Sequence, residues 1–144
     1  DAPTTLTRLL NMGVPPFNIA SSILMITAQR LARRLCTCKL PIDVPKQTLL
    51  NAGYSEADLD GSWTLYGPNG CDRCKGSGYK GRIGIYQVMP VSEAIQRIIM
   101  ANGNAIDIAA QAAREGVKTL RESGLLKVKQ GMTSLDEVLS TTNA

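Results

Sequence analysis

Residues 71–82 read Cys71-Asp-Arg-Cys74-Lys-Gly-Ser-Gly-Tyr-Lys-Gly-Arg82, and they are the most informative part of the chain. Two cysteines separated by two residues and followed by closely spaced glycines are typical of a short loop that wraps two thiolates around one metal ion. A second pair, Cys36 and Cys38, lies earlier in the chain. Together the four sulfurs predict a closed tetrahedral site. Such a site holds a fold together and turns over no substrate, so we expect no catalytic residue here.

The metal expected at this site is zinc. The chain contains no histidine, and cysteine sulfur is a preferred zinc ligand. However, Cys36 and Cys38 are separated by a single residue, which is tighter than the usual ligand pair. Buried free thiols and a redox-active Cys71–Cys74 disulfide are therefore alternatives. The glycines after Cys74 indicate a loop and not the helix start that activates a redox thiol, which disfavours the second alternative.

The composition indicates a globular chain and excludes several kinds of catalysis. Of the 144 residues, 44% are hydrophobic and 19% are charged, which is typical of a folded domain. The absence of histidine excludes Ser-His-Asp and Cys-His catalysis within this chain. No Gly-x-x-x-x-Gly-Lys-Ser/Thr loop occurs, so this chain alone is not expected to hydrolyse ATP. A net charge of +4 and 4% aromatic residues are weak signals for nucleic-acid binding.

The local patterns predict mainly helices. We expect a helix from Pro16 that continues to residue 35 and delivers Cys36, because apolar residues recur there at helical spacing. Polar residues, glycine and proline interrupt the uncharged stretch before Arg30, so we expect no membrane span. We expect a soluble protein from a reducing compartment. We also expect the chain to be a fragment of a longer protein. Ile83 to Val88 is the best strand. Further helices are expected at 46–52, 93–101, 105–115 and 119–130, and after a capping box at 134–137; a brief strand is expected at 63–66.

The arginines have two interpretations each. Arg30, Arg33 and Arg34 could contact a phosphate, but a solvated helix face near the metal site explains them as well. Arg82 follows a glycine and precedes a strand, where its side chain either points at a ligand or pairs with a carboxylate.

Five segments, read in order, resemble the type II/IV secretion ATPase family, which includes the type IV pilus assembly ATPases. The resemblance covers essentially the whole chain. Its segments are DAPTTLTRLL from Asp1, AQRLARRLC ending at Cys36, GCDRCKGSGYKGRIGIY from Gly70, VMPV from Val88 and GMTSLDEVL from Gly131.

The resemblance implies an α/β, mostly helical chain: the C-terminal part of a RecA-like P-loop ATPase domain, with a tetracysteine zinc subdomain and a C-terminal helical lobe. Residues 1–35 would end the RecA-like core, residues 36–82 would form the zinc subdomain, and residues 83–144 would form a strand returning to the core and the helical lobe. The Walker motifs of such a protein would lie upstream of Asp1.

The resemblance also implies the roles of individual residues. Cys71 and Cys74 match the second zinc pair, and Cys36 matches the first cysteine of the first pair. Cys38 departs by one residue from the more usual Cys-x-x-Cys. Arg82 matches an arginine beside the nucleotide base, and Arg30 lies in a motif near the nucleotide or the subunit boundary.

The function implied is that of a hexameric motor that powers type IV pilus assembly with ATP and magnesium. We expect it at the cytoplasmic face of a bacterial inner membrane, with an inner-membrane platform protein and pilus regulators as partners, no nucleic acid and no direct membrane insertion. The alternatives are a type II secretion or DNA-uptake motor of the same family, and a non-enzymatic zinc module such as that of DnaJ-type chaperones or a nucleic-acid-binding zinc ribbon.

Overall fold

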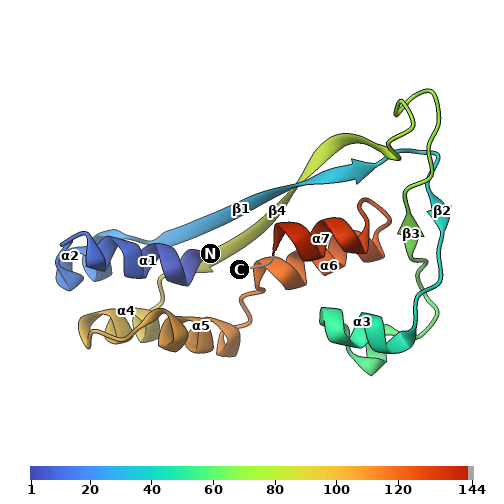
Figure 1. The fold of residues 1–144 in the computed structure, drawn as a ribbon. Coiled ribbons are helices and arrows are strands. Elements are labelled where there is room, and N and C mark those ends of the chain that lie inside the picture. Colours follow the sequence, from blue (N-terminus) through green and yellow to red (C-terminus); the bar gives the residue numbers. More distant parts are fainter. Residues whose placement is uncertain (143–144) are drawn as a thin grey trace. The chain divides into compact units, whose positions relative to one another are not determined.

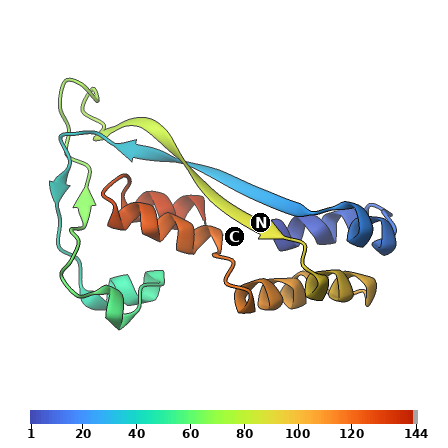
Figure 2. The same ribbon diagram turned by 180° about the vertical axis from the view of Figure 1, so that it is seen from behind.

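The computed structural model describes residues 1–142, and this part of the chain has an α/β fold (Figures 1 and 2). The strands form two separate two-stranded sheets, β1 with β4 and β2 with β3. In chain order the elements are α1 (Ala2–Asn11), α2 (Pro16–Ser22), β1 (Met25–Leu35), β2 (Leu40–Pro41), α3 (Lys46–Ala52), the 3-10 helix η1 (Glu56–Asp58), β3 (Tyr66–Gly67), β4 (Tyr79–Pro90), α4 (Glu93–Met100), α5 (Ala105–Arg114), α6 (Leu120–Lys129) and α7 (Leu135–Thr141).

The long strands β1 and β4 run in opposite directions (Figure 1). At one end the Val91 N–H donates to the Leu24 carbonyl over 2.8 Å, and at the other the Cys36 N–H donates to the Gly78 carbonyl over 3.0 Å. The partner's number falls as the residue number rises, as an antiparallel pair requires. The strand predicted from Ile83 to Val88 is confirmed, and from Ile83 to Met89 every second residue of β4 is buried, which leaves Val88 on the exposed face.

The helix expected up to residue 35 is wrong in its second half, because α2 ends at Ser22 and residues 25–35 form strand β1. The predicted pattern contained pairs of residues four apart, such as Leu24 with Ala28 and Leu31 with Leu35, and of these Ala28 and Leu35 are buried while Leu24 and Leu31 are exposed. Residues four apart share a face in a helix and in a strand alike, so this spacing does not distinguish the two. Pairing with β4, which lies far away in the sequence, decides in favour of the strand.

The chain divides into two compact units. Unit 1 comprises Asp1–Gln29 and Tyr86–Thr119. In it α2 packs on α4, α1 on α5, and α4 on α5. The Ala2 N–H donates to the side chain of Gln87 on β4, which ties the first helix to the strand. The core contains ten buried residues: Ala2, Leu6, Ile19, Ala20, Met89, Val91, Ile95, Ile99, Ile108 and Ala112.

Unit 2 comprises Arg30–Ile85 and the chain from Leu120 onward. Helices α6 and α7 pack against each other in it. The segment between the two cysteine pairs extends through β2, α3 and η1 and returns through β3 (Figure 1). At its far end the Tyr54 hydroxyl donates to the Leu125 carbonyl of α6 over 2.6 Å, and the Tyr54 ring lies 5.1 Å from that of Trp63. This segment is therefore attached to the helices of its unit as well as to the cysteines.

Several predicted elements are confirmed. Helix α3 begins and ends at the expected residues, and helices α4, α5 and α6 lie within the expected ranges. The brief strand expected at 63–66 is displaced, because β3 covers only Tyr66–Gly67. The three-part division at residues 35 and 82 stays a prediction; the compact units divide the chain at other positions. Among residues 1–142, none of the helices is both long and apolar enough to cross a bilayer.

Candidate metal centre

The four predicted cysteines come together in unit 2, with all their sulfurs within 4.8 Å of one another. The Sγ–Sγ distance is 3.6 Å between Cys36 and Cys71, 3.9 Å between Cys38 and Cys74, and 3.8 Å between Cys71 and Cys74. Four thiolates about 2.3 Å from one zinc ion would be separated by roughly 3.7 Å. The sulfurs thus have the spacing of a tetrahedral thiolate site, and the group could hold a metal ion.

The strands β1 and β4 bring the two cysteine pairs together. Cys36 directly follows the last residue of β1, and its N–H donates to the carbonyl of Gly78, one residue before β4. A turn follows at once, in which the Lys39 N–H donates to the Cys36 carbonyl over 3.0 Å. This turn brings Cys38 into the group despite the single residue between the first two cysteines.

The loop between Cys71 and Gly78 directs N–H groups at a sulfur. The N–H groups of Cys71 and Gly78 each donate to Cys74 Sγ over 3.2 Å. The loop closes on itself, with the Gly76 N–H donating to the Cys71 carbonyl over 2.9 Å. Hydrogen bonds of this kind hold a ligand in place and stabilise its thiolate.

The environment separates the pKa values of the thiols. Desolvation raises the pKa of Cys74, but the N–H groups of Cys71 and Gly78 outweigh it and lower the pKa to about 6. Hydrogen bonding with Cys74 also lowers the pKa of Cys71. In contrast, desolvation raises the pKa of Cys38 to about 11. Since a metal binds thiolates, we expect binding at neutral pH to release the Cys38 proton.

The chemistry of the donors fits zinc better than the alternatives. All four cysteines are free thiols, and their sulfurs lie far beyond the roughly 2.05 Å of a disulfide bond. Residues 75–78 form turns that lead into β4, so the helix that activates a redox thiol does not follow Cys74. Four soft donors at tetrahedral spacing, with N–H groups directed at one of them, are the features of a structural zinc site.

Basic side chains lie close to Cys36. Arg34 and Arg73 line a recess of about 320 Å³ with Cys36 and Lys80. Cations here offset the net negative charge of four thiolates around one divalent ion. The ammonium group of Lys39, the residue after Cys38, donates to the Gly131 carbonyl over 2.6 Å.

The arginines lie on strands and not on a helix face, which corrects the solvated-helix interpretation. Arg30 is exposed on β1, and Arg82 is exposed on β4. Their proximity to a nucleotide stays a prediction. Arg33 forms an ion pair of 2.7 Å with Glu137.

Glu137 is the residue that sequence reasoning missed. The pattern Ser134-x-x-Glu137 predicted a capping box, and the Ser134 hydroxyl does accept the Glu137 N–H at the start of α7. The carboxylate of Glu137 binds Arg33 on β1 instead of the backbone of Ser134. A glutamate at this position can either complete the capping box or bind Arg33, and the sequence contains no signal that distinguishes the two arrangements.

Comparisons with known proteins agree with the sequence pattern. The family model for the type II/IV secretion system protein matches residues 1–140. The chain is 58% identical over 142 residues to the type IV pilus assembly ATPase PilB of Pseudomonas aeruginosa, covering 98% of this chain and 25% of that protein. It is 52% identical over 145 residues to PilB of Acinetobacter baylyi, covering 99% of this chain and 25% of that protein.

Similarity extends to the type II secretion proteins at a lower level. The type II secretion system protein E of Aeromonas hydrophila is 36% identical over 138 residues, covering 95% of this chain and 27% of that protein. The chain thus spans about a quarter of the length of these curated relatives.

Proposed function

Because the chain belongs to the type II/IV secretion system protein family, we propose that it is one part of a motor ATPase that powers type IV pilus assembly. The observation that carries this proposal is the identity of 58% with a pilus assembly ATPase over nearly the whole chain. Identity with type II secretion proteins is lower, at 36% and 38% for two of them. The difference favours pilus assembly over type II secretion.

The chain's own contribution to the motor is its metal centre. We assign zinc to the four cysteines, because their spacing and chemistry match a structural site. When bound, the ion would tie the end of β1 to the loop before β4. The segment between the cysteine pairs would then be fastened at its base by the metal and at its far end by Tyr54 on α6. A segment fastened at both ends is suited to transmit motion between the parts of a motor.

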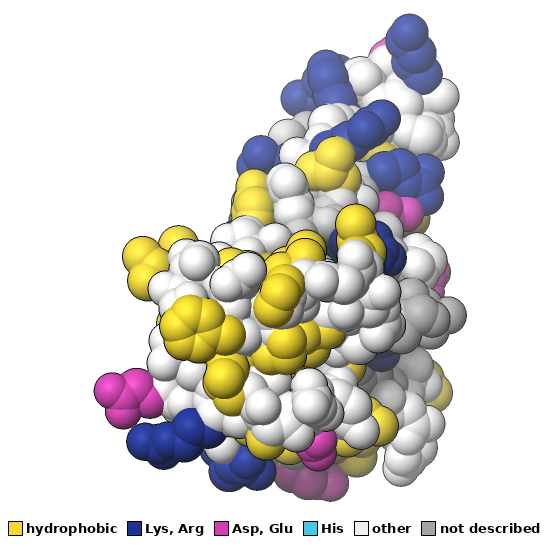
Figure 3. Space-filling model, turned by 90° about the vertical axis from the view of Figure 1, so that its left-hand side faces the viewer, with side chains coloured by type: hydrophobic (Ala, Val, Ile, Leu, Met, Phe, Trp, Pro, Cys, Tyr) yellow, Lys and Arg dark blue, Asp and Glu magenta, His cyan; other side chains and the backbone are white. Residues whose placement is uncertain are grey.

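We assign residues 1–35, together with the strand that returns from residue 83, to the end of a RecA-like core. In support, unit 1 exposes hydrophobic side chains that a larger α/β domain would cover (Figure 3). Tyr86 and Val88 of β4 are about half exposed, at 51% and 49%. Phe17 and Met100, from α2 and α4, line an open recess. Exposed apolar side chains that gather on one part of a surface are typical of a region that another domain or chain covers.

The activity proposed for the whole protein follows from the family. The whole protein would be a hexamer that hydrolyses ATP with magnesium. It would work at the cytoplasmic face of a bacterial inner membrane, without inserting into the bilayer. It acts on an inner-membrane platform protein, responds to pilus regulators and needs no nucleic acid. Arg82 and Arg30 would lie near the nucleotide; their side chains are exposed on the paired strands β4 and β1.

Two measurements test this function. The full-length protein should hydrolyse ATP, whereas the 144-residue chain should not, because it has no phosphate-binding loop. The gene should restore pili to a strain that lacks its pilus motor, and should fail to restore export in a strain that lacks its type II secretion ATPase. Restored export without pili would overturn the pilus assignment in favour of type II secretion.

A third measurement tests the metal centre. The purified protein should contain one zinc per chain, and changing both Cys71 and Cys74 to serine should abolish zinc binding and pilus assembly. Unchanged thermal stability and unchanged pilus output in this double variant would contradict a structural metal.

A further inference from the structure

The turn between α6 and α7, residues 131–134, lies against the strand segment that leads into Cys36. The Leu35 N–H donates to the Met132 carbonyl over 2.9 Å. The Thr133 hydroxyl donates to the Arg33 carbonyl over 2.8 Å, and Thr133 is fully buried. The backbone directly before the first cysteine is therefore held by the C-terminal helices of the same unit.

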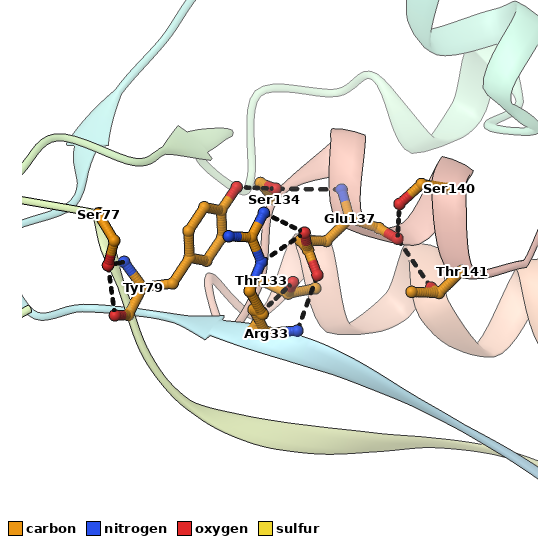
Figure 4. Close-up of polar contacts among 8 residues, drawn as sticks. All are labelled: Arg33, Ser77, Tyr79, Thr133, Ser134, Glu137, Ser140 and Thr141. Carbon is orange, nitrogen blue, oxygen red and sulfur yellow. Dashed lines mark hydrogen bonds and ion pairs between the residues drawn. The ribbon is translucent and has the colours of Figure 1, made fainter.

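An ion pair continues this contact into α7 (Figure 4). The Arg33 guanidinium donates to Glu137 Oε1 through Nε over 2.9 Å and through Nη2 over 2.7 Å. The backbone N–H of Arg33 donates to Glu137 Oε2 over 2.8 Å. The guanidinium also lies 4.1 Å from the centre of the Tyr79 ring, and the Tyr79 hydroxyl is 2.7 Å from Ser134 Oγ. One network thus joins β1, the first residue of β4 and the start of α7.

Burial makes this pair unlike an ordinary surface salt bridge. The Glu137 side chain is only 11% exposed, while that of Arg33 is 57% exposed. Burial by itself raises the pKa of Glu137, but the hydrogen bonds from Arg33 outweigh it and lower the pKa. A buried carboxylate with three charge-assisted or backbone donors depends strongly on its partner. Removing one member should disturb the position of the other.

A second connection lies on the far side of Cys36. Lys39, the residue after Cys38, donates from Nζ to the Gly131 carbonyl, and its ammonium lies 4.5 Å from the centre of the Tyr66 ring. The α6–α7 turn therefore contacts the chain on both sides of the first cysteine pair: at Arg33–Leu35 before the pair and at Lys39 after it.

We propose that residues 131–137 are a positioning element for the metal centre, and that Glu137, through Arg33, helps to hold Cys36 and Cys38 in the geometry that the metal ion needs. This inference rests on the metal binding proposed above. The coupling is reciprocal by thermodynamic linkage. Loss of the metal loosens the start of α7, and loss of the Arg33–Glu137 pair weakens the binding of the metal.

The first test measures zinc release from the full-length protein to a chromogenic chelator. Glu137→Gln keeps the size of the side chain and removes its charge, and Thr133→Val removes only the hydroxyl. Residues that support metal ligands typically contribute at least tenfold to metal affinity, and a loss of affinity appears mainly in the dissociation rate, so both variants should release zinc roughly tenfold faster. Glu56→Gln is the matched control, since Glu56 forms an exposed ion pair with Lys46 in the same unit and should leave the rate unchanged.

Two further measurements distinguish positioning from general stability. The visible spectrum of the cobalt-substituted protein reports ligand geometry and should shift in Glu137→Gln. In the wild-type protein, removing zinc with a chelator should speed amide hydrogen exchange in residues 132–138 as well as in residues 71–78.

Three results would overturn the proposal. Zinc release and cobalt spectra identical to wild type in both variants would show that Glu137 and Thr133 do not position the ligands. Exchange in residues 132–138 that stays slow after zinc removal would show that α7 is independent of the metal. A wild-type protein that binds no zinc would overturn the metal centre itself, and the coupling with it.

Discussion

At the scale of single residues, Gly78 shows why the cysteine loop needs its glycines. Its φ is +83°, a conformation that other residues rarely adopt. A Cβ atom here would lie 2.4 Å from Pro68 Cβ and 3.0 Å from Pro68 Cα. The same residue donates its N–H to Cys74 Sγ. A side chain at position 78 would therefore push the loop away from the sulfur that it supports.

A matched pair of substitutions tests this interpretation. Gly76 has a similar φ of +79° but has nothing within 4 Å of its Cβ position. Gly76→Ala should lower the free energy of unfolding by about 1–2 kcal/mol through backbone strain alone. Gly78→Ala should lower it further, by about 1–3 kcal/mol for the overlap with Pro68, and should also weaken zinc binding. Urea unfolding and zinc titration measure both effects; equal losses in the two variants would contradict the close contact.

Glu137 marks the limit of what a residue's own neighbourhood in the sequence reveals. Its place three residues after Ser134 predicted the helix start, and α7 does begin at Leu135. Its carboxylate, however, binds a residue on β1. A local pattern specifies a helix end because the atoms concerned are a few residues apart, but it carries no information on a partner from another element.

At the scale of elements, β1 is the clearest difference between expectation and structure. Apolar residues at helical spacing predicted a helix up to residue 35, whereas residues 25–35 are extended and pair with β4. The free energy that a segment gains from hydrogen bonding and burial against a neighbouring strand is larger than the free energy of its intrinsic conformational preference. Helices α3, α4 and α5 were predicted correctly because their ends carry local signals: proline, serine or asparagine at the start, and glycine at or just after the end.

Gly124 in α6 has a different meaning in the sequence and in the structure. In the sequence it is a weak point, since glycine destabilises the middle of a helix by about 1 kcal/mol relative to alanine. In the structure it is buried where α6 meets α7, and a Cβ atom would lie 2.7 Å from Val138 Cγ1 and 3.3 Å from Ile85 Cδ1. The glycine allows the two helices to approach closely.

Gly124→Ala should therefore destabilise the protein despite its better helix propensity. We expect a net loss of about 1–2 kcal/mol, because overpacking of a tight core outweighs the gain in propensity. Val138→Ala alone should also destabilise, by leaving a cavity. The double variant should lose less free energy of unfolding than the sum of the losses in the two single variants, because the new methyl group occupies the space vacated by valine. A stabilised Gly124→Ala variant in urea unfolding would show that α6 and α7 are not in close contact.

At the scale of the whole molecule, each of the two compact units has its own means of stabilisation. Unit 1 has a continuous apolar core to which α1, α2, α4 and α5 contribute. In unit 2, two of the close sulfur pairs join residues far apart in the chain: Cys36 and Cys71 are separated by 35 positions, and Cys38 and Cys74 by 36. The four sulfurs therefore bring together the two ends of the long segment between the cysteine pairs. A metal that closes such a long segment stabilises mainly the unit that contains it.

This organisation predicts separate responses to core damage and to metal removal. Ile99→Ala, at a fully buried position of unit 1, should lower the free energy of unfolding by about 2–5 kcal/mol and leave zinc release unchanged. A chelator should speed hydrogen exchange in unit 2 and leave the amides of α4 and α5 protected. Faster zinc release from Ile99→Ala, or exchange that rises equally in both units after chelation, would contradict the independence of the units.

The four thiols, the ends of most helices and the family could be predicted before the fold was known, because they depend on residue identity and on contacts within a few residues. Three features could not: β1 is a strand, Cys36 lies beside Cys71, and Glu137 binds Arg33. Each of these features requires contacts between residues far apart in the chain. Their free energy comes from pairing and burial between elements, which no local pattern contains.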